Sequence, residues 1–575
     1  MTHVRGGYEY EAQGRPFWLM TDANTPSEVE DTVRSTIDIS SAEAARAGAL
    51  NPSGGPFCRQ TPTLKYLASL SLVFLVQAFF FGFVALHRFV DADEGFFLLA
   101  SRLVLMHKKP YLDFLFEQAP LLPYVYALHM KIFGISWAAT RMLAAVLTAV
   151  LGTLVCEDVW RHTRRWAAAF AAVILFASST LIFGYFPVVK TYSLAGLFLF
   201  ASYVIISRIS TTTPGWAVAA GGLLLGLGVE ARSYLLLVIP LFLWWISNRS
   251  NRANRPALML WFLSGTAVAL LPSLYLFLSS PSAFLFSNLK YHALRSDGGL
   301  VGNWQEKVIA LLVTFVGAAE SNGVQTSILF VVALGFVFSI RRPGYRPRFA
   351  FQVAVLVGII SLLPTPVHPQ YFCLCIPLLL SAAVCVVCDL IADVESRPGK
   401  LVAAVASLAL VLVYVASSAN DFRRYLVTGD QVPGVDLSND NQDWSLQRIL
   451  AVSAAVDQVA TPGEVVATCW PGFIFQTRAV PLPGQEADYG LMIADKLTPE
   501  QRAKYHVLSA SDLEADFAAH KPRVVVLRNH IPAKGGKLWQ QLLQTEDDFR
   551  SLLLAHDYKM VRSIGGISIY IGPKS

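Results

Sequence analysis

The sequence predicts a polytopic α-helical membrane protein, and three observations support this fold class. Among its 575 residues, 54% are hydrophobic and only 15% are charged, with a mean hydropathy of +0.48. Eleven apolar runs approach the length of a membrane span, and the loops between them alternate between basic and nearly uncharged. Because a soluble domain carries about 25% charged residues, we exclude an ordinary cytosolic enzyme, a disordered chain and a disulfide-rich secreted module.

The N-terminal segment and the cysteines say little about function. Residues 1–62 are mostly polar, so we expect a disordered cytosolic tail. Cys385 and Cys388 form a C-x-x-C pattern inside an apolar run, which favours inert buried thiols over a redox or metal site. A net charge of +6 is too small to indicate a nucleic-acid partner.

The apolar runs define the expected bundle, because a helix needs about 20 apolar residues to cross a bilayer. We expect spans at 65–87, 137–159, 166–184, 191–208, 215–230, 233–247, 257–278, 324–340, 349–363, 371–390 and 401–418. The fifth and sixth are short. Together the runs place a bundle of about eleven transmembrane helices within residues 63–419.

Basic residues in the short loops predict the orientation of the bundle. If the N-terminus is cytosolic, the loops after the even-numbered spans are cytosolic as well. These loops (160–166, 207–210, 248–256, 341–348 and 395–400) contain thirteen Arg or Lys residues, whereas the opposite loops are nearly free of them. Since basic residues accumulate on the cytosolic side, we expect residues 88–136, 279–323 and 420–575 to lie outside.

The last of these segments has the composition of a soluble domain. Helix-like runs at 446–459, 511–520 and 537–555 alternate with β-rich runs at 464–469, 523–527 and 568–571. This alternation predicts an extracytoplasmic α/β domain over 420–575. It contains neither a Walker loop nor a dinucleotide-binding fingerprint, so we assign it no chemistry.

A cluster of acidic residues follows the first span. Asp91, Asp93 and Glu94 stand at the membrane boundary, before an amphipathic stretch at 95–107 and then Glu117. Clustered carboxylates can raise one another's pKa, hold a cation or act as a general base toward a hydroxyl. A solvated loop in which Asp93 caps a helix explains the same residues equally well, and composition alone does not choose between the two.

The order of the motifs carries a resemblance to a known family. The Asp93-Glu94 loop, a short amphipathic helix, Glu117 and an aromatic segment ending in Phe133-Gly134 follow one another, and Arg141 begins the second span. Weaker elements follow at 226–240, 368–380 and 461–481. In this order they resemble the GT-C membrane glycosyltransferases, within the branch that contains protein O-mannosyltransferases and bacterial aminoarabinose transferases. The resemblance covers about residues 65–575.

The resemblance implies a reaction. A sugar linked to a polyprenyl phosphate would be the donor, presented from the outer leaflet of a bacterial inner or plasma membrane. An acidic residue of the first outer loop would deprotonate an acceptor hydroxyl on a lipid, glycan or protein, and that hydroxyl would displace the lipid phosphate with inversion. The family's base falls on Asp93, with Glu94 beside it.

Other site residues follow from the same resemblance. Glu117 and His292 fall on residues that bind a divalent metal in some members. Gln118 replaces a family lysine that binds the donor phosphate, so another cation must take its place. The candidates for this role are Arg232, Arg295, Lys190 and Arg102.

Some of these residues have alternative interpretations. Arg232 either contacts the phosphate or pairs with Glu230, since ionisable groups inside a membrane usually pair or serve a pathway. His368 and Tyr371 either line the donor cavity or belong to an interfacial aromatic belt. Asp91 is either a second member of the acidic cluster or a solvated boundary residue.

Two function classes compete with a glycosyltransferase. A lipid or solute transporter, such as a flippase, would show repeated halves and broken helices at the bilayer midplane, but the sequence has no convincing internal repeat and its acidic cluster lies at the membrane edge. A membrane-anchored scaffold would not need the charged residues between the spans.

Overall fold

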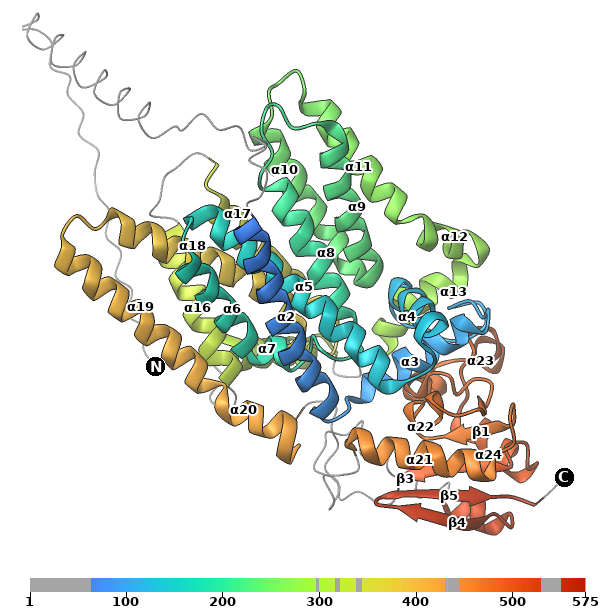
Figure 1. Cartoon of the computed structure of the whole chain (residues 1–575). Coiled ribbons are helices and arrows are strands. Elements are labelled where there is room, and N and C mark those ends of the chain that lie inside the picture. Colours follow the sequence, from blue (N-terminus) through green and yellow to red (C-terminus); the bar gives the residue numbers. More distant parts are fainter. Residues whose placement is uncertain are drawn as a thin grey trace, which may run out of the picture. The chain divides into compact units, whose positions relative to one another are not determined.

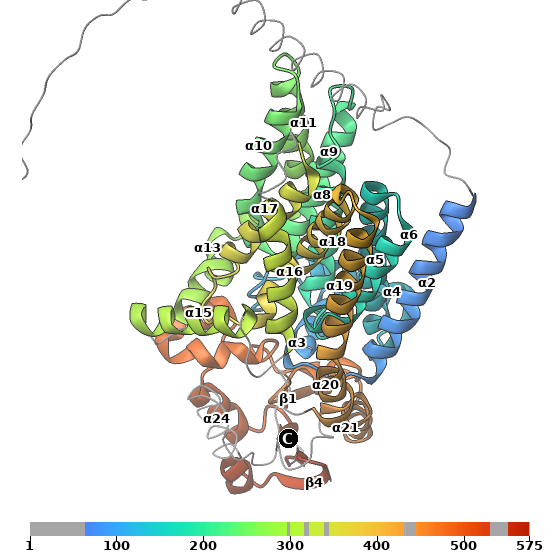
Figure 2. The same cartoon turned by 90° about the vertical axis from the view of Figure 1, so that its left-hand side faces the viewer.

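The computed structural model describes residues 64–295, 299–315, 321–337, 344–429, 432, 444–528 and 550–573. These residues all belong to one compact unit, Arg59–Ser575. The predicted cytosolic tail, 1–62, lies outside the described residues. Figures 1 and 2 show the chain from two directions.

Helices dominate the described part. The chain begins with α2 (Leu64–His87), α3 (Ala92–Leu105), α4 (Leu121–Phe133), α5 (Trp137–Thr163), α6 (Trp166–Ser178), α7 (Thr180–Phe183) and α8 (Thr191–Ile206). It continues with α9 (Gly215–Ala231), η1 (Ser233–Val238), α10 (Ile239–Arg249), α11 (Arg255–Ala269), α12 (Leu271–Ser279), α13 (Pro281–Leu285), η2 (Phe286–Lys290) and α14 (Tyr291–Leu294). Then follow α15 (Gly299–Phe315), α16 (Ser321–Val337), α17 (Arg346–Ile360), η3 (Pro369–Cys375), α18 (Ile376–Asp393), α19 (Arg397–Ser417), α20 (Ala419–Arg423) and η4 (Arg424–Thr428).

Each of the eleven predicted apolar runs contains helix. In the described part, four helices are long and apolar enough to cross a membrane: Leu64–His87, Trp137–Thr163, Pro369–Asp393 and Arg397–Thr428. A fifth is added if Arg255–Ala269 and Leu271–Ser279, which are bent by 52°, form one span. Shorter apolar helices cover most of the other runs. The structure is therefore that of a helical membrane protein, and the number of eleven crossings stays a prediction.

The C-terminal segment contains a mixed sheet. Its helices are α21 (Leu446–Val459), α22 (Gly472–Phe475), η6 (Asp488–Lys496), α23 (Pro499–Tyr505) and α24 (Ala510–Ala518). Its strands are β1 (Val465–Thr468), β2 (Val480–Pro481), β3 (Val524–Arg528), β4 (Lys559–Ile564) and β5 (Ile567–Ile571), in the spatial order β2-β1-β3-β5-β4. β1 runs parallel to β2 and β3, and β5 runs antiparallel to β3 and β4.

This segment contains strands at the three predicted places and helices at two of the predicted three. Most of the third predicted helix, 537–555, lies outside the described residues. Strands β2 and β4 have no counterpart in the prediction, because Val480–Pro481 is too short to show alternation and the side chains of β4 are largely exposed. A separate domain over 420–575 stays a prediction.

Helix α3 joins the C-terminal segment to the bundle, and Figure 1 shows α3 next to α22. The indole Nε1 of Trp470 donates to the carbonyl of Ala92 at 2.7 Å. Gly95 faces the same ring, and a Cβ there would lie 2.6 Å from Trp470 and from the backbone of Gly472. Glycine at position 95 therefore permits the close contact between α3 and α22.

Arg102 strengthens this contact, and this role differs from the phosphate binding that the sequence predicted for it. Its guanidinium, 6% exposed, donates to the carbonyls of Ile474 at 2.8 Å and Ala479 at 2.6 Å. Because buried carbonyls already occupy its donors, Arg102 fastens the C-terminal segment to α3 and is not placed to bind a donor phosphate.

Candidate functional site

The acidic cluster forms the first turn of α3. Asp91 is the N-cap: its carboxylate accepts from the backbone N–H of Asp93 at 3.0 Å, while the Glu94 carboxylate accepts from the N–H of Asp91 at 2.9 Å. This reciprocal capping box satisfies backbone donors that a helix N-terminus otherwise leaves unpaired. The alternative interpretation of the sequence named Asp93 as the cap, and the structure gives that position to Asp91.

Glu94 is buried in an ion pair with Arg141 of α5. The Nε of Arg141 lies 2.8 Å from one carboxylate oxygen and its Nη2 lies 2.5 Å from the other, and both side chains are fully buried. The N–H of Val189 also donates to Glu94, at 3.1 Å. Since both oxygens of Glu94 are occupied and inaccessible, the geometry makes it a positioning residue and does not support the expected role beside the base.

Lys190 connects Asp91 and Asp93. Its ammonium lies 2.8 Å from Asp91 and 3.0 Å from Asp93, and it is 2% exposed. Because this ammonium already neutralises two carboxylates, Lys190 has a different role from the phosphate binding that the sequence predicted for it. Asp91 is 1% exposed, whereas 38% of the Asp93 side chain is accessible. Of the three clustered acids, Asp93 is thus the one that can meet a substrate.

The two aspartates have opposite pKa shifts. Burial raises the pKa of Asp91 above its ordinary value, although Lys190 opposes this effect. Burial also favours the neutral form of Asp93, but the ammonium of Lys190 and a 2.7 Å hydrogen bond from the hydroxyl of Tyr489 outweigh it and hold the pKa of Asp93 below its ordinary value. Asp93 is therefore a carboxylate at neutral pH and can accept a proton.

Arg232 lies between the C-terminus of α9 and η1, and tyrosine rings surround it. Its guanidinium carbon is 4.3 Å from the centroid of Tyr192 and 5.3 Å from that of Tyr371, and its Nε donates to the hydroxyl of Thr191 at 2.7 Å. Within the described residues it forms no ion pair, and Glu230 instead accepts from a backbone N–H of α12. The alternative Arg232–Glu230 pair is thus not present.

Arg295 directly follows α14 and lies near Asp93, with Tyr489 in contact with both. Its guanidinium lies 5.8 Å from the centroid of Tyr489, the tyrosine that holds Asp93. It is close enough to Asp93, His292 and His368 to lower the pKa of each. Like Arg232, it forms no ion pair within the described residues, and it is partly exposed.

His368 and Tyr371, expected either in the cavity wall or in an aromatic belt, lie at this site. Their rings are 5.5 Å apart, and Tyr371 also faces Arg232. Burial lowers the pKa of His368 to about 4, with Arg295 and Lys190 acting in the same direction. His368 is therefore neutral at neutral pH.

Glu117 and His292 are in contact, but the contact is between the His292 ring and the backbone of Glu117 and does not involve the Glu117 carboxylate. The Nε2 of His292 donates to the carbonyl oxygen of Glu117 at 2.9 Å, and burial lowers the pKa of His292 to about 4. The carbonyl of Gln118 accepts from the hydroxyl of Tyr111 at 2.6 Å. No group of three or more His, Cys, Asp or Glu side chains that could hold a metal ion occurs in the part of the chain that the structure describes. The metal role that the resemblance implies for Glu117 and His292 stays a prediction.

Sequence reasoning missed Tyr489 and the aromatic surroundings of Arg232. Tyr489 belongs to η6, 396 residues after Asp93, and no motif marks it. Tyr192 and Tyr234 also face Arg232. Tyr192 is the second residue of α8, and Tyr234 lies two residues after Arg232. The proximity of Tyr234 in the sequence was a weak indication that it could contact Arg232.

Comparisons with solved structures identify the fold. ArnT from Cupriavidus metallidurans in the apo state matches over 88% of this chain and 100% of its own, with a TM-score of 0.59 and 14% identity. The chain has a GT-C glycosyltransferase fold. The same ArnT bound to undecaprenyl phosphate gives a TM-score of 0.56 at 14% identity, with the same coverage of 88% and 100%.

An oligosaccharyltransferase from Archaeoglobus fulgidus gives a TM-score of 0.47 at 13% identity, over 88% of this chain and 74% of that one. The fold assignment depends on ArnT alone. No protein-family model matches the sequence, and no curated protein matches it either.

We predict that Glu94→Gln lowers the stability of the folded protein, because Glu94 supports the structure of the site and does not take part in the reaction. Breaking a buried ion pair costs about 3–5 kcal/mol, because the remaining charge stays buried without its partner. The melting temperature of the detergent-purified protein should fall well below that of wild type and of Asp93→Asn. Equal melting temperatures for Glu94→Gln and wild type would contradict the positioning role.

We predict that the folded protein loses stability as the pH falls from about 6.5 toward 4. Both His292 and His368 titrate near 4 when folded and near about 6.5 when unfolded, so the unfolded state takes up protons first. Thermal unfolding across this range should show a fall in melting temperature of several degrees. Replacing both histidines with Gln should reduce the slope, and an unchanged slope would contradict the assignment.

Proposed function

We propose that this protein is a membrane glycosyltransferase that moves a sugar from a polyprenyl-phosphate-linked donor to an acceptor hydroxyl, with inversion at the anomeric carbon. The observation that carries the proposal is the geometry around Asp93 in a GT-C fold. Asp93 is an accessible carboxylate, and Arg295 lies near it through Tyr489. Neither Arg295 nor Arg232, which Tyr371 connects to His368, forms an ion pair among the described residues. A base and a phosphate site are the two things that this transfer requires.

Asp93 is the proposed general base. The acceptor hydroxyl would attack the anomeric carbon, its proton would pass to the Asp93 carboxylate, and the bond between that carbon and the phosphate oxygen would break to release polyprenyl phosphate. A carboxylate of low pKa is a weak base, but a hydroxyl becomes acidic as it bonds to an oxocarbenium-like carbon. Proton transfer late in the reaction therefore suits Asp93 as Lys190 and Tyr489 hold it.

Arg232 and Arg295 are the proposed phosphate ligands. An arginine fork donates two parallel hydrogen bonds and stays charged at every physiological pH, which suits a phosphodiester and the phosphate that leaves. The tyrosine rings around Arg232 keep the guanidinium in place without consuming its charge. These two residues replace the family lysine whose position Gln118 occupies. Lys190 and Arg102 serve other partners, and no step of the proposal uses a metal.

The location of the reaction is also part of the proposal. The positive residues of the loops support a site on the outer face, with the N-terminus cytosolic and residues 420–575 extracytoplasmic. ArnT of the same fold has been observed with undecaprenyl phosphate, which supports a lipid-phosphate donor. The acceptor is a lipid, a glycan or a protein.

We predict that Asp93→Asn abolishes transfer while leaving the fold intact. Purified protein is incubated with a panel of polyprenyl-phosphate sugars and with membrane extract as the acceptor source, and released polyprenyl phosphate is measured. Because general-base catalysis contributes about 10²–10⁴-fold, the variant should lose at least about 100-fold in rate. Asp113→Asn, an exposed carboxylate that accepts from the N–H of Lys109, is the matched control and should behave as wild type.

Two outcomes contradict this part of the proposal. Release of polyprenyl phosphate by Asp93→Asn at the wild-type rate would remove Asp93 as the base. No release by wild type with any donor would remove the transferase function.

We predict that Arg232→Ala and Arg295→Ala weaken donor use. A hydrogen bond to a charged group contributes about 1.5–3 kcal/mol, so KM for the donor should rise about 10- to 100-fold in each variant. Arg252→Ala, an exposed arginine between α10 and α11, is the control and should leave KM unchanged. An unaltered donor KM in both site variants would show that other groups bind the phosphate.

A further inference from the structure

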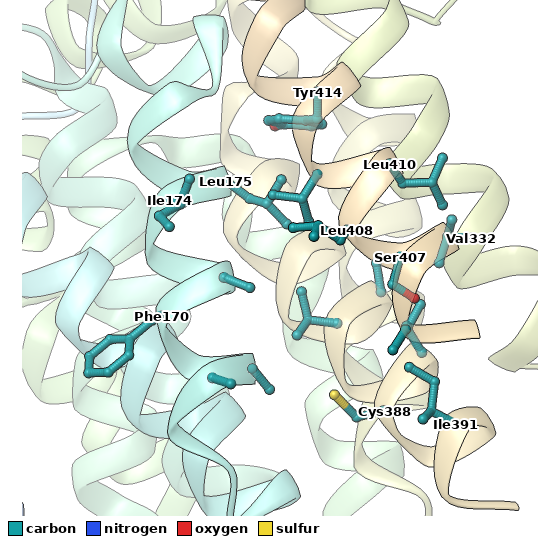
Figure 3. Close-up of a pocket in the computed structure, with 18 of the residues that line it drawn as sticks. Phe170, Ile174, Leu175, Val332, Cys388, Ile391, Ser407, Leu408, Leu410 and Tyr414 are labelled. Atoms are coloured by element: carbon teal, nitrogen blue, oxygen red, sulfur yellow. The ribbon is translucent and has the colours of Figure 1, made fainter. Parts of the chain in front are cut away.

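A second site lies away from the acidic cluster, between helices that border the membrane. A pocket of about 490 Å³ separates α6 from α19, with α16 and α18 forming its floor. Figure 3 shows the side chains of Phe170, Ile174 and Leu175 on one wall and those of Leu408 and Tyr414 on the other. Its volume lies in the range of ligand sites in proteins, about 300–1,000 Å³.

The pocket is apolar along its length and basic at one end. Nearly all of its lining residues are aliphatic or aromatic, and Arg165 is the one charged residue among them. Arg165 is exposed and forms no ion pair within the described residues.

A second basic residue extends this end of the pocket. Lys400 on α19 precedes Ala404, Ser407 and Leu408, which line the pocket, by one to two helical turns. Residues four apart share a face of a helix, so exposed Lys400 stands on the pocket face of α19, at the mouth. Asp389, the carboxylate next to Cys388, is engaged by His162 and by the hydroxyl of Tyr345.

The position of the pocket separates it from the proposed active site. α5 begins at Trp137, which stacks on Trp470 beside α3, and ends at Thr163, two residues before Arg165. Since its 27 residues extend about 40 Å, the basic mouth faces the opposite end of the bundle. Helix α19 also has little of its surface covered by the protein, since only 11% of the apolar stretch of Arg397–Thr428 is buried.

We propose that this pocket binds an anionic glycerophospholipid of the leaflet opposite to the proposed active site. One acyl chain lies between α6 and α19, and Arg165 and Lys400 meet the phosphodiester. The 13 residues of α6 extend about 20 Å, enough for a chain that reaches the middle of a hydrocarbon core about 30 Å thick. Basic pockets between transmembrane helices commonly bind anionic headgroups. The bound lipid would fill the gap that leaves α19 so little buried.

Native mass spectrometry of the full chain tests this proposal. The protein is released from nanodiscs that contain equal amounts of phosphatidylglycerol and phosphatidylcholine. Wild type should retain one phosphatidylglycerol in preference to phosphatidylcholine by about 30-fold, since each of the two basic residues near the headgroup contributes about 1 kcal/mol. The Arg165→Ala, Lys400→Ala double variant should retain the two lipids equally.

A second pair of variants separates binding in the pocket from binding elsewhere. Ala404→Trp fills the pocket and should remove the retained lipid, whereas Ala406→Trp adds the same ring to an exposed position of α19 outside it and should not. Size-exclusion profiles check that each variant is folded. Retention of no lipid, equal retention of both lipids by wild type, or retention of polyprenyl phosphate in place of phospholipid would overturn the proposal. None of these results depends on transferase activity.

Discussion

The buried pair of Glu94 and Arg141 is the interaction on which the site depends. Arg141 holds the carbonyls of Ala85 and Arg88 at the end of α2, while Glu94 accepts from the backbone of Asp91 and Val189. One ion pair thus fixes the turn between α2 and α3 and the segment that leads to Lys190. Water is excluded there, so each hydrogen bond is costly to break, and the acidic turn is held rigidly.

Because the turn is rigid, Asp91, Asp93 and Glu94 have three different roles. Glu94 supports the backbone, Asp91 caps α3 and pairs with Lys190, and Asp93 alone keeps an accessible carboxylate. The division is physical: the first turn of a helix points successive side chains in different directions, and only one of the three directions leads away from the protein interior. A proposed base at Asp93 is consistent with this arrangement, as is a supporting role for the acids on either side.

The C-terminal segment is part of the site as well as a neighbour of the bundle. Tyr489 reaches Asp93 and faces Arg295, and Arg102 with Trp470 fastens the same segment to α3. The hydroxyl of Tyr489 lowers the pKa of Asp93 together with Lys190. The segment to which the sequence assigned no chemistry therefore supplies a side chain to the candidate base.

The sequence by itself determined that this is a helical membrane protein, where most of its helices lie, and that an acidic cluster with Asp93 follows the first of them. These features are local: apolar runs, loop charge and motif order. Only the tertiary structure decided that Glu94 and Arg102 are occupied by buried partners, that Arg232 stands free of Glu230, and that Tyr489 completes the site. Burial and pairing depend on residues hundreds of positions apart, which no local pattern records.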